Sequence, residues 1–326
     1  MDSLGLPLFI SADCSRAEQS RMLGLFAAYC YEYKGNAAST IANKIAAVRW
    51  YHVHHGGVEL PHHPIEASII KALQKLSGGT KPRHGMYLST ILSAYEGICS
   101  QGAKAAFIWH GVLAAYFLLA RTSELFRSAS GDKGLKYCVV REDVTFYSAG
   151  AATPISSAHT ADEVRVVIRR SKTDQPGDGS TRSLRANGGG LNDPVACFAW
   201  LLRHSHSGSP TQPLMTIGSA RGPHVITRYE VATLVKDIAA RAGLVPALYS
   251  THSMRIGAAT TLAHAGLEPR LIMLAGRWRS TAFMVYVRDN LEDFRRISDS
   301  LASTRLVDVM PQVSSKRASR QARRTR

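Results

Sequence analysis

The chain has 326 residues, of which 45% are hydrophobic, and its 40 lysines and arginines outnumber its 24 acidic residues, giving a formal charge of +16. This excess predicts a polyanionic partner, either nucleic acid or an anionic membrane surface. The sequence offers no apolar run near the ~18 residues of a membrane-spanning helix and no basic segment at its start, so we expect neither a membrane-embedded protein nor a secretory signal.

The first region, residues 1–78, is predicted to be a small helical bundle. Apolar residues recur there at spacings of three and four, the period of an amphipathic helix. Ser15 is placed as a helix N-cap. The predicted helices are Ser15–Tyr33, Ser39–His55 and Pro64–Leu76. A linker rich in glycine, proline and basic residues follows at Ser77–Gly85.

Residues 79–310 are predicted to form a second, mainly helical domain with a small antiparallel sheet, so the fold class is mainly α (α+β). Runs of β-branched residues predict strands at Tyr137–Val140 and Val164–Ile168. The segment after the second run, RRSKTDQPGDGS, is typical of a hairpin tip and contains Lys172. Helical patterns occupy Tyr87–Cys99, Ala103–Leu119, Ala196–Arg203, Tyr229–Ala242, Met254–Ala265 and Glu268–Ala275.

The last region, residues 311–326, is a basic tail without an acidic residue. We expect it to be disordered alone and to bind nucleic-acid phosphates, with a merely solubilising tail as the alternative. Its cations are Lys316, Arg317, Arg320, Arg323, Arg324 and Arg326. The five cysteines of the chain have no paired spacing, which favours reduced thiols in the nucleus, or in the cytoplasm or nucleoid.

The residues suited to chemistry are concentrated between Thr251 and Arg288. There His252 and Arg255 lie three apart, so at the start of a helix both face one way. A Gly-Arg-Trp turn ends at Trp278, and Tyr286 follows it. Upstream, after the apolar run AAYFLLA, Arg121 and Glu124 are also three apart, and Lys172 lies between the two segments.

This ordered set resembles the catalytic residues of tyrosine recombinases, which use Arg, a β-hairpin Lys, His-x-x-Arg, a His or Trp, and Tyr. The segments THSMRIGAAT and GRWRSTAFMVYVR are most similar to sequences of the branch found in DIRS-type retrotransposons and Crypton elements. The resemblance covers about Met86–Ala302, and it is much weaker for the N-terminal bundle, which corresponds in size and placement to the family's core-binding domain.

The resemblance implies a mechanism that suits these residue types. Arg121 and Arg255 would clamp the non-bridging phosphate oxygens with forked donors, which a lysine cannot do. Tyr286 would attack phosphorus and form a 3′-phosphotyrosyl bond, with His252 as its base. Lys172 would protonate the departing 5′ oxygen. Because the covalent link conserves the ester bond, we expect neither a metal nor another cofactor nor ATP.

The position of the family's His or Trp is open in this sequence. That residue usually follows the glycine directly, nine before the tyrosine, and here this is Arg277. Trp278, one residue later, is favoured for the role because its indole N–H can reach a phosphate oxygen and its ring can pack against the tyrosine segment. Glu124 matches the acidic residue of the family, and we expect it to orient the site by accepting hydrogen bonds.

The implied partner is duplex DNA, gripped by the two domains. Lys81 and Arg83 of the linker and the basic tail would contact its phosphates. The residues after Tyr286 are expected to form an amphipathic helix. This helix would pack either on its own domain or into a neighbouring protomer, as in the family's homotetramer on two duplexes. The predicted activity is integration or excision of a mobile element.

Several alternatives remain beside this interpretation. A DNA-binding protein without cleavage and a DNA-relaxing enzyme of the type IB topoisomerase kind share parts of the pattern. Lys133 and Lys136 compete with Lys172, and Tyr249 is the next candidate nucleophile. A histidine cluster lacks the spacing of a standard metal site, so we interpret it as polar residues at the surface or facing DNA. It comprises His52, His54, His55, His62 and His63.

Overall fold

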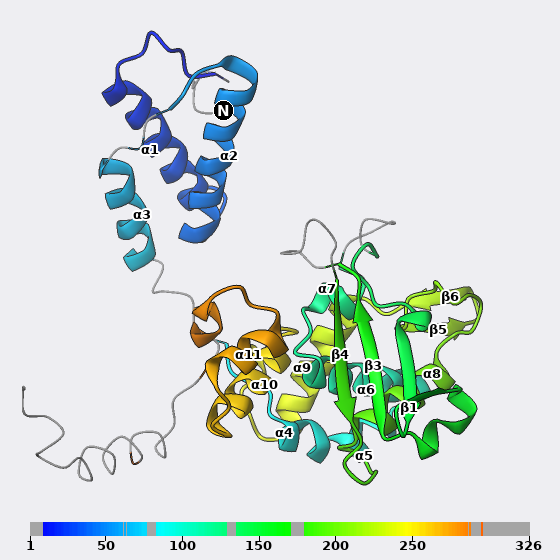
Figure 1. Ribbon diagram of the computed structural model, residues 1–326. Helices are drawn as coiled ribbons and strands as arrows, with labels where there is room; N and C mark the ends of the chain where they lie inside the picture. Colours follow the sequence, from blue (N-terminus) through cyan, green and yellow to red (C-terminus); the bar gives the residue numbers. More distant parts are fainter. Residues whose placement is uncertain are drawn as a thin grey trace, which may run out of the picture. The chain divides into compact units, whose positions relative to one another are not determined.

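The computed structural model describes residues 9–60, 62, 64–76, 83–128, 135–170, 179–285, 287 and 295. The chain divides into two compact units, Met1–Pro82 and Arg83–Arg326. The first is helical, and the second combines helices with a small antiparallel sheet (Figure 1). The predicted fold class, mainly α with a small sheet, is therefore confirmed.

The first unit consists of three helices around one apolar core. They are α1 (Arg16–Glu32), α2 (Ala38–Gly56) and α3 (Pro64–Leu76). Ser15 caps α1 as predicted, since its hydroxyl accepts a bond from the Glu18 amide at 3.3 Å while the Glu18 carboxylate accepts one from the Ser15 amide at 2.9 Å. The core side chains include Ile10, Leu23, Ala27, Ile41 and Ile45.

The histidines of this unit do not form one surface cluster. His52 is 2% exposed and is fully used inside the fold: its Nε2 accepts from the Ile10 amide at 2.9 Å, and its Nδ1 donates to the Val48 carbonyl at 2.7 Å. The interpretation of His52 as a surface or DNA-facing residue is therefore wrong. His54 stacks on Trp50 instead, with ring centroids 4.2 Å apart. Among the described residues, no three side chains suited to metal binding come together.

The second unit is built around α6 (Ala103–Phe117). Every residue of α6 from Phe107 to Tyr116 is buried, as expected for a helix that is apolar all round. The other helices are α4 (Leu88–Ser93), α5 (Tyr95–Cys99), α7 (Thr122–Leu125), α8 (Pro194–His204), α9 (Arg228–Arg241), α10 (Ser253–His264) and α11 (Pro269–Gly276). None of the helices in the described ranges has the length and apolarity needed to span a bilayer.

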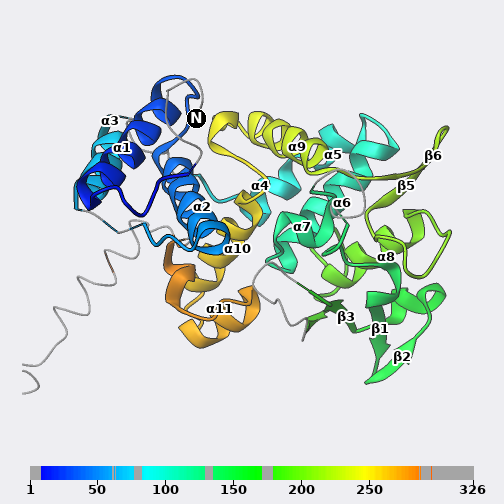
Figure 2. The same ribbon diagram turned by 90° about the horizontal axis from the view of Figure 1, so that it is seen from above.

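Two views place α10 and α11 at the end of this unit opposite a small two-stranded sheet (Figures 1 and 2). That sheet pairs β5 (Thr216–Ser219) with β6 (Gly222–Val225). A larger antiparallel sheet has the order β2-β1-β3-β4 and lies against the helices. Its strands are β1 (Val144–Ser148), β2 (Ala151–Thr153), β3 (Glu163–Ile168) and β4 (Ser180–Arg185).

The register of β3 with β4 determines which β4 side chains face the core. Val166 lies opposite Arg182, and Ile168 lies opposite Ser180. Directly opposed residues of an antiparallel pair project to the same face. Because Val166 is fully buried and Ile168 is 2% exposed, Arg182 and Ser180 lie on the core side of the sheet.

The sequence located one strand correctly and misplaced another. The predicted strand Val164–Ile168 is confirmed within β3, which pairs antiparallel with β4, and residues 171–178 of the predicted hairpin tip lie outside the described residues. The predicted strand Tyr137–Val140 is wrong, because Val140 makes only an isolated bridge and then caps a 3-10 turn, its amide donating to Asp143 at 2.9 Å. The strand begins after this turn, at Val144.

Gly257 of α10 lies directly against the chain at Met86. A Cβ at Gly257 would be 2.0 Å from the Met86 carbonyl oxygen, and the Met86 amide is bonded to the Ser253 carbonyl at 2.8 Å. We predict that Gly257→Ala lowers the free energy of unfolding by about 1–3 kcal/mol, because backbone cannot yield as a flexible side chain can. Urea unfolding measures this. Gly218→Ala, whose Cβ would have no neighbour closer than 3.9 Å, is the control, and an equal loss in both variants would contradict the argument.

Candidate active site

The first candidate arginine lies where α6 ends. The chain turns sharply after α6, with Leu119 at a φ of +46°, and Arg121 becomes the N-cap of α7. Glu124 is 1% exposed and accepts from the Arg121 amide at 2.8 Å and from the Arg121 guanidinium at 3.0 Å. The carboxylate thereby fixes both the backbone and the side chain of Arg121.

The second candidate arginine, Arg255, lies in the first turn of α10 and is 1% exposed. Its Nη1 donates to the Leu119 carbonyl and its Nη2 to the Gly276 carbonyl. One face of its guanidinium stacks on the indole of Trp278, with the Cζ atom 4.2 Å from the ring centroid. These contacts bring Arg255 next to the segment that carries Arg121, although the two are far apart in sequence.

Arg277 and Trp278 make different contacts in the site. Arg277 ends α11 in the left-handed conformation, at a φ of +57°. Its guanidinium pairs with Glu124 and donates to the Leu118 carbonyl at 3.3 Å. Trp278 packs beside Arg255. The sequence left either residue open for the His or Trp position, and the structure gives each a separate set of contacts.

The carboxyl ends of two helices hold these guanidiniums. Leu118 and Leu119 follow α6, and Gly276 closes α11, so their carbonyls lie at the negative ends of the two helix dipoles. Cationic side chains at such ends satisfy carbonyls that the helix itself leaves without a partner. The helix ends therefore offset part of the repulsion among several buried cations.

Backbone strain also concentrates here. Among the described residues only three that are not glycine have a positive φ, and two of them are Leu119 and Arg277. Such conformations cost about 1–3 kcal/mol each and persist where surrounding contacts enforce them. At Leu119 the contact is the hydrogen bond from Arg255 to its carbonyl, and at Arg277 it is the ion pair with Glu124.

His252 precedes α10 and lies near two of the arginines. Burial lowers the pKa of its imidazole below the usual range, and the charges of Arg255 and Arg121 lower it further. The ring is therefore neutral at neutral pH. A neutral imidazole beside two guanidiniums can accept a proton without first losing one.

Other predicted site residues lie elsewhere or outside the described residues. Arg83 donates to the Ala247 carbonyl at 2.6 Å at the start of the second unit. Lys136 lies over the Tyr137 ring, and Tyr249 is 5% exposed in the core, where burial raises its pKa. The positions outside the described residues are Lys81, Lys133, Lys172, Tyr286, the helix expected after it apart from Val287 and Arg295, and the basic tail with Lys316, Arg317, Arg320, Arg323 and Arg324.

Sequence reasoning missed one arginine that the fold brings to this place. Arg182 of β4 donates from Nη2 to the Leu274 carbonyl of α11 at 2.6 Å, and the Arg277 amide donates to the same carbonyl at 3.3 Å. Burial lowers the pKa of Arg182 to about 10, and the charge of Arg277 lowers it too, against the opposing effect of Glu124. The segment STRSLR lacks β-branched runs, so only its register with β3 reveals that Arg182 faces inward.

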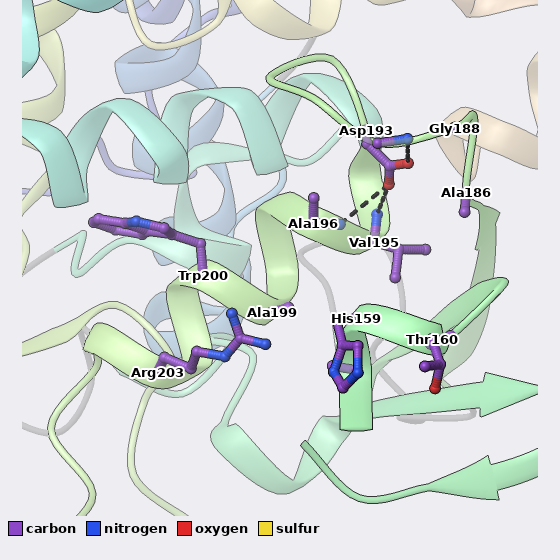
Figure 3. A pocket seen from close by; sticks show the side chains of 13 residues that line it. His159, Thr160, Ala186, Gly188, Asp193, Val195, Ala196, Ala199, Trp200 and Arg203 are labelled. Atoms are coloured by element: carbon purple, nitrogen blue, oxygen red, sulfur yellow. Dashed lines mark hydrogen bonds between the residues drawn. The ribbon is translucent and has the colours of Figure 1, made fainter. Parts of the chain in front are cut away.

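A separate pocket of about 550 Å³ lies between η4 (Ile155–Thr160) and α8. Figure 3 shows His159 of η4 and Arg203 of α8 among the side chains that line it, and Asp193 capping α8 at one end. The Asp193 carboxylate accepts from the Val195 amide at 2.7 Å and from the Gly189 amide at 2.8 Å, so its acceptors are used by the fold. The pocket shares no lining residue with the site formed by Arg121, Glu124, His252, Arg255, Arg277 and Trp278.

The sequence matches no model of a known protein family and no curated protein. Its fold is similar to that of the Tn1549 transposon integrase in complex with transposon right-end DNA, with a TM-score of 0.55 at 13% identity over 90% of this chain and 88% of that one. It is also similar to the XerH site-specific recombinase bound to a palindromic difH substrate in a post-cleavage complex, with a TM-score of 0.54 at 13% identity over 89% of this chain and 71% of that one. The chain therefore has the fold of these DNA-bound integrases and recombinases.

Proposed function

We propose that this protein is a tyrosine recombinase that cuts and rejoins duplex DNA through Tyr286, for the integration or excision of a mobile element. The observation that carries the proposal is the convergence of Arg121, His252 and Arg255 from segments more than a hundred residues apart: Arg255 bonds the Leu119 carbonyl, two residues before Arg121, and the charges of both arginines act on His252. The fold shared with DNA-bound integrases supports it. The residues of the motifs THSMRIGAAT and GRWRSTAFMVYVR favour the DIRS-type and Crypton branch.

In the proposed reaction, the two arginines stabilise the charge that builds on the phosphate. A guanidinium carries five N–H donors, so Arg255 can hold two backbone carbonyls and a phosphate oxygen at once. His252 accepts the phenolic proton as the Tyr286 oxygen bonds to phosphorus. The bond from phosphorus to the 5′ oxygen breaks, and Lys172 supplies the proton to that oxygen. A second 5′-hydroxyl then reverses the step and releases Tyr286.

The partners proposed for this reaction follow from charge and from the fold. A formal charge of +16 suits a duplex, and phosphate contacts make the affinity fall steeply with salt. Two duplexes must be held together for strands to be exchanged, which requires an assembly of several protomers, proposed here as a homotetramer. The step moves one ester bond to another and needs no ATP.

The test is to incubate the full chain with a library of nicked duplexes and to sequence the DNA ends that remain attached after denaturation with detergent. A nick next to the scissile bond lets the 5′ fragment leave, so the covalent product accumulates. A recurring 3′ end linked to protein supports the proposal and defines the target. Binding without any attached end would favour the DNA-binding alternative, and relaxation of supercoiled plasmids without a preferred site would favour the topoisomerase one.

Arg255→Lys is predicted to reduce covalent complexes by about 10²–10³-fold, a range typical for the loss of one donor that stabilises a transition state. A lysine ammonium cannot bridge the Leu119 and Gly276 carbonyls while stacking on Trp278. DNA affinity should change far less, as measured by fluorescence anisotropy on the same duplex. Arg228→Lys, an exposed arginine stacked on Tyr229, is the matched control. Equal losses of binding and cleavage in Arg255→Lys would show that Arg255 only anchors the backbone.

A further inference from the structure

Buried polar atoms without a partner gather at one place in the second unit. In the described part of the chain, four buried side-chain nitrogen or oxygen atoms lack a hydrogen-bond partner. One belongs to Ser20 in the first unit. The other three are Ser180 Oγ, Arg182 Nε and Arg277 Nε. A buried polar group left unpaired is costly, so three of them together indicate that an acceptor belongs there.

Arg182 links the other two residues, since it shares a strand face with Ser180 and lies near Arg277. Ser180 and Arg182 are two apart on β4, on the side facing the core, where the opposing β3 residues are valine and isoleucine. The Leu274 carbonyl accepts from the Arg182 guanidinium and from the Arg277 backbone amide, and the charge of the Arg277 guanidinium acts on that of Arg182. The Arg277 side chain is 10% exposed, whereas Ser180 and Arg182 are only half-buried.

The positive charges around Arg182 and Arg277 outnumber the carboxylates paired with them. Arg277 is paired with the Glu124 carboxylate, which also holds Arg121. Arg182 contacts only the backbone carbonyls of Thr181 and Leu274, and no carboxylate within the described ranges. A second guanidinium next to Arg277 is unfavourable in the protein alone and becomes favourable once an anion lies beside it.

We propose that Ser180, Arg182 and Arg277 form a binding site for a phosphate group of the DNA backbone. The inference rests on the proposed function and extends its phosphate site from Arg121 and Arg255 onto the sheet. Phosphate oxygens supply acceptors for the two guanidiniums, and forked guanidiniums suit a tetrahedral anion better than ammonium groups do. The Ser180 hydroxyl adds a neutral donor.

The first test uses inorganic phosphate and thermal unfolding of the full chain, comparing phosphate with chloride at equal ionic strength. We expect phosphate at ten times its dissociation constant to raise the unfolding midpoint of the wild type by about 3 °C. Arg182→Met should lose most of this rise, and Arg182→Lys should also lose much of it. Arg185→Met removes an exposed cation from the same strand and should keep it.

The midpoint in chloride separates a binding role from a structural one. Arg182→Met removes a buried cation beside Arg277, so its midpoint in chloride should equal or exceed that of the wild type. A midpoint lowered equally in chloride and phosphate would mean that Arg182 only supports the fold, and would overturn the inference. A wild type that phosphate does not stabilise more than Arg182→Met would overturn it as well.

A second arm distinguishes DNA phosphates from free phosphate. The affinity for a 30-base-pair duplex of mixed sequence is measured against salt, and the slope of the logarithmic plot should fall by about 0.9 in Arg182→Met if one phosphate contact is lost. An unchanged slope would overturn the assignment to the DNA backbone. Neither arm involves Tyr286, so a chain that forms no covalent complex, which would refute the proposed function, can still give the expected phosphate result.

Discussion

Tyr286→Phe is expected to abolish covalent protein–DNA complexes while DNA binding stays within about twofold of the wild type. The substitution removes only the hydroxyl oxygen that would attack phosphorus, and no remaining atom of the ring can form the ester. In the proposed complex, the phosphate contacts that supply most of the affinity would come from arginines and lysines elsewhere. Detergent-stable complexes on nicked duplexes report the chemistry, and anisotropy on an intact duplex reports binding.

Two other tyrosines provide controls for this result. Tyr229 is 70% exposed and outside the site, so Tyr229→Phe should form complexes as the wild type does. Tyr249 is buried in the core, and its pKa is raised by burial, so Tyr249→Phe should also retain activity. Complexes that persist in Tyr286→Phe but vanish in Tyr249→Phe would move the nucleophile to Tyr249.

Glu124→Gln is expected to lower the free energy of unfolding by about 3–5 kcal/mol, the range for breaking one side of a buried ion pair. Glu124 is 1% exposed and the Arg277 side chain 10%, so the loss leaves a buried cation without its counter-charge. Glutamine keeps the shape of the side chain but neither its charge nor its second acceptor oxygen. Urea unfolding followed by circular dichroism measures the change.

A double variant tests the cause of that loss. If the uncompensated charge of Arg277 dominates, Glu124→Gln combined with Arg277→Met should be more stable than Glu124→Gln alone. Asp237→Asn, which breaks the surface pair with Arg241, is the matched control and should cost less than about 1 kcal/mol. A similar small cost for Glu124→Gln would show that the pair contributes little to stability.

The elements that sequence predicted well are those with strong local signals. The α1 helix begins at a Ser-x-x-Glu cap, and the helix that follows His252 and carries Arg255 begins at Ser253, one residue before the predicted start. The β4 strand has no such signal, since STRSLR becomes a strand through its pairing with β3. Tyr137–Val140 had the composition of a strand, but the capping carboxylate of Asp143 converts the chain there into a turn.

The same distinction applies to the site. Spacing along the chain was enough to select Arg121, Glu124, His252 and Arg255, which the fold does bring together. It could not separate Arg277 from Trp278, because their contacts depend on a left-handed turn at the end of α11. It also could not select Arg182, whose inward position depends on strand register, or recognise that His52 is used by the Ile10 amide.

The pairing of Glu124 with Arg277 spans 153 positions of the chain, and this has a consequence for protein synthesis. A ribosome must translate residue 277 before the last guanidinium can reach its carboxylate, and Tyr286, the proposed nucleophile, follows later still. The buried helix α6 also packs on α8, α9 and α10, so a nascent chain cannot complete the core around α6 before those later segments have emerged. Under the proposed function, a nascent chain would therefore acquire the residues for strand cleavage only after most of its core segments had been made.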